Sequence, residues 1–132
     1  MTIDSQKVQI TADQQTIADF LSDAQNLIHL LPQDKITDFK ADANQCSFKV
    51  QGGITISLVE DGTDGPSQLF LKSGDASPFP FRLTIHTAPN KGGTEGYIHF
   101  EGQVNPFMKM IVEKPLTHLF DYMSNKLKEY YA

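Results

Sequence analysis

The sequence predicts an α+β protein in which a curved, seven-stranded antiparallel sheet wraps around a long C-terminal helix. Three observations predict it. One alternating segment and two short helical patterns come first, before residue 33. Apolar and polar residues then alternate in six further segments up to residue 104, with turn residues between them. The last part of the chain carries an apolar stripe at helical spacing.

The first elements are a strand and two short helices. Residues 3–10 alternate as a half-buried strand does. The segments 11–14 and 22–25 each have the form of a capping box, in which a hydroxyl and a glutamine satisfy the free N–H groups that begin a helix. The helical stripes that follow consist of Ile17, Phe20 and Leu21, and then of Leu27, Ile28 and Leu31. Pro32 ends the second helix, because a residue before proline avoids the helical conformation.

The middle of the chain has a period of two. The predicted strands cover residues 36–41, 46–50, 54–59, 69–71, 81–86 and 98–104. The turns between them lie at 42–44, Gly52–Gly53, 61–66, 73–80 and 89–93. Most of these strands are apolar on one face and polar on the other, as in an antiparallel sheet with one solvated face. The short turns favour a meander of hairpins.

A long helix closes the sequence. Asn105 is a favourable N-cap, and Pro106 suits the first helical position. The apolar stripe consists of Phe107, Met108, Ile111, Val112, Leu116, Leu119, Phe120, Met123, Leu127 and Tyr130. Pro115 predicts a kink within the helix. No other element is long and apolar enough to cover the concave face of a curled sheet, and a space remains between the two unless bulky side chains fill it.

Composition narrows the possible partners. The 132 residues suit one domain, spanning 1–132. A net charge of −5 argues against a nucleic-acid partner, because phosphate binding requires a basic surface. The start of the chain lacks the apolar run of a signal peptide, and no stretch approaches the ~20 apolar residues that span a bilayer. We therefore expect a cytoplasmic protein without stable membrane insertion; the oligomeric state stays open.

Two groups of residues resemble a known superfamily. Residues 20–23, 26–27 and 31–32 (FLSD, NL and LP) resemble the helix pair of small bacterial members of the START-like (SRPBCC) superfamily. Residues 104–110 and 114–116 (VNPFMKM and KPL) resemble the start of their last helix. The resemblance covers the whole chain. It implies the helix-grip fold that polyketide cyclases, pollen-allergen-like proteins and lipid-transfer domains share, with a hydrophobic cavity between sheet and helix for a lipid, sterol or polyketide-like molecule.

Candidate ligand-binding residues follow from the inward positions of the strands and the last helix. They are Phe48, Ile56, Leu58, Leu71, Leu83, Ile85, Ile98, Phe100, Met108, Ile111, Val112, Leu119 and Met123. His118 and Tyr122, four residues apart on the flank of the helix, are expected at the cavity rim, where they would hydrogen-bond a polar end of the ligand. The alternative is that the apolar residues only pack the core. An apolar space above about 300 Å³ would be typical of a ligand site.

The pattern contains little that predicts catalysis. The inward positions carry only Gly102 and Cys46 as weakly polar exceptions. His99 and Glu101 alternate with apolar neighbours, so both are expected to face solvent. The four histidines lack the spacing of metal ligands, and neither glycine pair has the sequence of a phosphate-binding loop. We predict no catalytic residue, metal or cofactor.

Three functions remain open. The first is the binding or transport of a hydrophobic small molecule by a protein that is not an enzyme. The second is an enzyme like polyketide cyclases or dehydratases, with His118, Tyr122 or a strand histidine that faces inward against expectation as base. The third is an interaction module with a collapsed cavity, which works through the outer face of the sheet. A fully packed interior would argue against the first.

Overall fold

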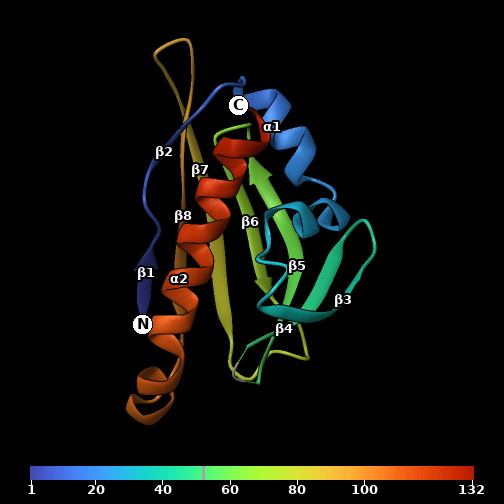
Figure 1. Ribbon diagram of the computed structural model, residues 1–132, viewed down its shortest axis with the longest axis vertical. Coiled ribbons are helices and arrows are strands. Elements are labelled where there is room, and N and C mark those ends of the chain that lie inside the picture. The colour runs from blue at the N-terminus through green and yellow to red at the C-terminus, as the bar shows by residue number, and fades with distance from the viewer. Residues whose placement is uncertain (52) are drawn as a thin grey trace.

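The structure, a computed structural model, describes residues 1–51 and 53–132; Gly52, from the predicted Gly52–Gly53 turn, lies outside the described residues. A sheet curves along one long helix, and two short helices cover one end (Figure 1). In chain order the elements are β1 (Thr2–Asp4), β2 (Val8–Ile10), α1 (Gln14–Leu21), η1 (Ala24–Leu30), β3 (Ile36–Ala41), β4 (Gln45–Val50), β5 (Ile54–Asp64), β6 (Gln68–Ser73), β7 (Phe81–Asn90), β8 (Gly93–Gly102) and α2 (Pro106–Tyr130).

The strand order confirms the predicted fold class. The order is β1-β8-β7-β6-β5-β4-β3, all antiparallel, and β2 also pairs with β8. The predicted first strand is therefore split in two, although both parts lie beside the same neighbour. Pairing stops at Asp4↔His99 and resumes at Val8↔Gly96, so that residues 5–7 face only residues 97 and 98. The extra residue breaks the strand, as in a β-bulge.

The predicted caps of the two short helices were wrong. α1 begins after Asp13, whose carboxylate accepts a hydrogen bond from the backbone N–H of Thr16 at 2.7 Å. η1 is a 3₁₀ helix, and the carboxylate of Asp23 accepts from the N–H of Gln25 at 3.0 Å. A short acidic side chain caps as well as a hydroxyl. Hence the caps are these aspartates and not Thr11 and Ser22.

Several strand boundaries also differ from the prediction. β5 continues through residues 61–64, which were expected in a turn, because an irregularity in the register between Glu60 and Thr63 absorbs the turn residues within the strand. β8 ends at Gly102 and leaves Val104 outside the sheet. The hairpin between β7 and β8 turns at Lys91 and Gly92, with φ of 52° and 79°. Positive φ at both positions is typical of the tightest hairpin turns.

The predicted alternation is confirmed where it matters for the core. Leu83, Ile85, Ile98 and Phe100 are buried against the helix side. Beneath the helix, aromatic rings pack on one another: the ring centroids of Phe100 and Phe120 lie 5.2 Å apart. Further contacts join Phe100 to Phe79 and Phe81. A Cβ on Gly102 would lie 2.9 Å from the Phe100 ring, so glycine makes room for this cluster.

The last helix runs without interruption through Pro115. The predicted cap is confirmed, since Asn105 Oδ1 accepts from the N–H of Met108 at 2.7 Å. Its buried residues are Val112, Leu116, Leu119, Phe120, Met123, Ser124 and Leu127. The first turns, by contrast, extend past the start of β1 (Figure 1). No helix among the described residues is both long and apolar enough to cross a membrane.

Candidate functional site

A groove of about 560 Å³ lies beside the middle of α2. One wall is α2 itself, another is the segment that joins η1 to β3, and the third is the end of β4. It opens to solvent on one side. The lining residues are Pro32, Asp34, Lys35, Val50, Gln51, Lys114, Pro115, His118, Leu119 and Tyr122. The volume falls in the range typical of small-molecule sites.

The groove has an apolar floor and a polar rim. Pro32, Val50 and Leu119 are buried and present carbon to the space. Lys114 and His118 are exposed and belong to the rim. A site of this kind shelters the apolar body of a ligand and leaves its polar end near water.

The space beneath the C-terminal half of the helix is nearly filled. A hollow between the sheet and α2, lined by Ile85, Ile98, Met123 and their neighbours, holds only about 10 Å³. Large side chains from both layers occupy the rest of this region, as the aromatic contacts of Phe100 and Phe120 illustrate. The ligand-sized space therefore lies along the side of the helix.

The structure brings three of the predicted residues to the groove: His118, Leu119 and Tyr122. Most of the others are buried in the core: Phe48, Ile56, Leu58, Leu71, Leu83, Ile85, Ile98, Phe100, Val112 and Met123. Met108 is half-buried against that core. Ile111 is 48% exposed and points outward, a correction to its predicted inward position. Ligand contact by any of these residues stays a prediction.

Sequence reasoning missed most of the groove. Pro32, Lys35 and Val50 lie on segments far from α2 in the sequence, and no local pattern places them beside that helix. The one available signal was Pro115, since a proline lacks the N–H that a regular helical turn requires and so marks an irregular place in α2. The meeting of the other walls depends on the tertiary fold.

One inward carboxyl was also missed. Glu60 shares the strand parity of Ile56 and Leu58, so the alternation itself predicts that it faces inward. Its Oε1 atom is buried without a hydrogen-bond partner among the described residues. Burial and, second, the negative charge of Asp23 raise the pKa of Glu60. This carboxyl lies on the part of β5 beside the start of β4, whereas the groove lies at the end of β4.

The predicted outward position of His99 and Glu101 is confirmed. The ring of His99 bonds Glu101 Oε1 at 2.9 Å through Nε2 and Asp4 Oδ1 at 2.5 Å through Nδ1. The hydrogen bonds with Glu101 and then Asp4 raise the pKa of His99. This cluster joins β1 to β8 on the outer face of the sheet, away from α2. The described residues hold no group of side chains arranged to bind a metal ion.

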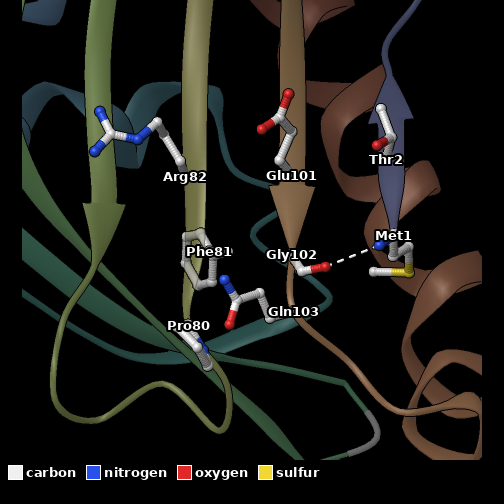
Figure 2. A pocket seen from close by; sticks show the side chains of 8 residues that line it. All are labelled: Met1, Thr2, Pro80, Phe81, Arg82, Glu101, Gly102 and Gln103. Carbon is white, nitrogen blue, oxygen red and sulfur yellow. Dashed lines mark hydrogen bonds between the residues drawn. The ribbon is translucent and has the colours of Figure 1, made fainter.

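A second hollow, of about 440 Å³, lies at the end of the sheet where β1 and β7 begin and β8 ends. Figure 2 shows two of its lining residues, Arg82 and Glu101, on the neighbouring strands β7 and β8, and the hydrogen bond of 2.8 Å that the amino group of Met1 donates to the carbonyl of Gly102. The guanidinium of Arg82 already binds Asp61 on the outer face, at 3.1 Å. The lining of this second hollow is more polar than that of the groove. It therefore offers less shelter to an apolar ligand.

Comparisons with known proteins show the fold. No protein-family model matches the chain, and no curated protein matches it. Among solved structures, the KanY protein is similar at a TM-score of 0.78 and 16% identity, over 99% of this chain and 97% of that one. A START superfamily protein from Mycobacterium smegmatis is similar at a TM-score of 0.66 and 14% identity, over 98% of each chain.

A third structure is a point mutant of norcoclaurine synthase from Thalictrum flavum, in complex with a transition state analogue. It is similar at a TM-score of 0.69 and 16% identity, over 100% of this chain and 96% of that one. Identities this low show a common fold and leave function open. The chain therefore has the START-like, helix-grip fold that the resemblance in its sequence predicts.

Proposed function

We propose that this protein binds or transports a hydrophobic small molecule, and that the groove beside α2 is where the molecule lies. The observation that carries the proposal is the groove of about 560 Å³ with its floor of Pro32, Val50 and Leu119. Burying apolar ligand surface on such a floor gives about 25 cal/mol per Å². A lipid, sterol or polyketide-like molecule has enough apolar surface to use it.

The location of polar groups supports binding over catalysis. A general base needs a partner that orients it. The histidine with two such partners is His99, and it lies on the outer face of the sheet, remote from the groove. His118, on the groove rim, is exposed to water. A polar rim of this kind suits a hydrogen bond to a ligand's polar end.

A plugging experiment tests the proposal. In His118→Trp a large ring at the rim fills the groove, while in the control Asn125→Trp the same ring is added at an exposed position of α2 outside the groove. Titration with the neutral dye Nile red should give saturable binding to the parent protein and to the control. Binding to His118→Trp should weaken at least about tenfold. Equal binding by both variants, or no saturable binding by the parent, would contradict the proposal.

Mass spectrometry of molecules extracted from the purified protein identifies the natural ligand in the same preparations. We expect a molecule that is abundant with the parent and the control and depleted with His118→Trp. The enzymatic alternative has one observation in its favour: His118 and Tyr122 line the same groove one helical turn apart. Turnover in a screen of polyketide-like substrates, lost in His118→Ala, would favour that alternative.

A further inference from the structure

The charges around the groove differ from those of the whole protein. The chain carries a net charge of −5. The groove is lined by two lysines, Lys35 and Lys114, and by one aspartate, Asp34. The balance at the groove is therefore positive on a protein that is otherwise acidic.

The two lysines lie on different walls. Lys114 belongs to α2, and Lys35 to the segment that leads into β3. A charged group bound at the rim would thus meet cations from two sides. Exposed lysines keep their ammonium groups in water and extend their carbon stems along apolar surface.

Neither lysine is neutralised by the described residues. The lysines in salt bridges are Lys49, Lys72, Lys109 and Lys126. Lys109, five residues before Lys114 on the same helix, pairs with Glu113 at 3.7 Å. Lys114 and Lys35 have no such partner within the described part of the chain, so both ammonium groups are available to a ligand.

We propose that the ligand is an amphipathic acid, with an apolar body on the floor of the groove and a carboxylate held between Lys35 and Lys114. This inference rests on the proposed function and names the ligand class. His118 and Tyr122 lie on the same rim and are placed to donate hydrogen bonds to the second carboxylate oxygen. Charge-assisted hydrogen bonds of this kind are stronger than neutral ones.

Two ligands of equal chain length test the charge directly: decanoate and 1-decanol, each measured by displacement of Nile red at neutral pH. We expect decanoate to bind about tenfold more tightly than decanol, since only the acid gains the two cations. The double variant Lys35→Gln/Lys114→Gln should lose that preference and keep its affinity for decanol. Lys128→Gln, an exposed lysine at the other end of α2, is the matched control and should behave as the parent.

A variant of opposite sign sharpens the test. Asp34→Asn removes the one carboxylate of the groove lining and should tighten decanoate binding by a factor of about two to five, without effect on decanol. Equal affinities for acid and alcohol, or a preference that survives loss of both lysines, would overturn the acid-binding inference and leave the hydrophobic site intact. If Nile red and both ligands fail to bind the parent protein, the proposed function itself falls.

Discussion

The two halves of α2 face different surroundings although they form one continuous helix. From Leu116 onward the helix packs on the sheet, and the side chain of Phe120 is only 3% exposed. Before Pro115 most of the surface is open: Phe107 is 72% exposed and Met110 84%. The groove lies where the two halves meet.

Hydrogen bonds from the N-terminal segment also anchor the C-terminal half of α2. Residues 4–6, called the clasp below, bond in three directions. Asp4 bonds His99 on the outer face of the sheet. Ser5 Oγ and Ser124 Oγ share a buried hydrogen bond of 2.8 Å. The N–H of Gln6 donates to Asp121 Oδ1 at 2.9 Å. The clasp therefore ties the C-terminal half of α2 to the edge of the sheet.

The comparison of the two halves shows that an apolar stripe alone does not determine whether a helix is buried. Both halves carry the apolar stripe that the sequence shows, yet in the first half only Val112 is fully buried and Met108 half-buried, whereas most of the stripe in the second half lies in the core. The anchored half fixes one wall of the groove, and the exposed half is free of that constraint. Each of the following predictions tests this division, from the largest expected effect to the smallest.

Two phenylalanines of the same helix give the strongest contrast. Phe120→Ala should lower the free energy of unfolding by about 3–5 kcal/mol, because it leaves a cavity against Phe100. Phe107→Ala should change it by no more than about 0.5 kcal/mol, because the ring is mostly in water already. Urea unfolding measures both. Similar losses for the two variants would show that the first turns of α2 are covered in solution.

The buried serine pair should contribute less. Ser124→Ala removes the bond to Ser5, which keeps its hydrogen bonds to Ile98 and Gln6, and we expect a loss of about 1 kcal/mol. Thr117→Ala is the control, since its hydroxyl bonds only the carbonyl of Glu113 within the helix, and alanine is the better helix former. A control that costs as much as Ser124→Ala in urea unfolding would remove the clasp from the explanation.

The smallest effect should come from the outer bond of the clasp. Because the pKa of His99 is raised on folding, its contribution to stability is fully present below the unfolded value of about 6.5 and is lost as pH rises through the folded value. Asp4 and Glu101 are more than half exposed, so we expect less than about 1 kcal/mol.

The variant His99→Gln should accordingly be less stable than the parent at about pH 5.5, and nearly equal to it at about pH 9. Urea midpoints at the two pH values measure the difference. A deficit that is the same at both pH values would mean that protonation of His99 does not hold β1 in place.

Local chemistry explains which features could be predicted. The alternation of apolar Leu83 with charged Arg82 predicts that Leu83 faces the core, because successive side chains on a strand point to opposite faces of the sheet. Asn105 and Pro106 predict where α2 begins, because a cap and a proline at the first helical position both depend only on the backbone of the first turn. The inward direction of Glu60 was missed, although the alternation along β5 predicts it. The caps of α1 and η1 were not decided by sequence in the same way, since Thr11 and Asp13 both offer an acceptor within two residues.

By itself, the sequence determined the fold class, the two faces of the sheet and the start of the last helix, since each depends on residues close together in the chain. Only the tertiary structure decided that phenylalanine rings fill the space under α2 and that the open space lies to its side. It also decided which lysines border that space. The physical reason is that side-chain volume and charge act through neighbours in space, and Lys35, Val50 and Lys114 become neighbours only when the sheet has closed around the helix.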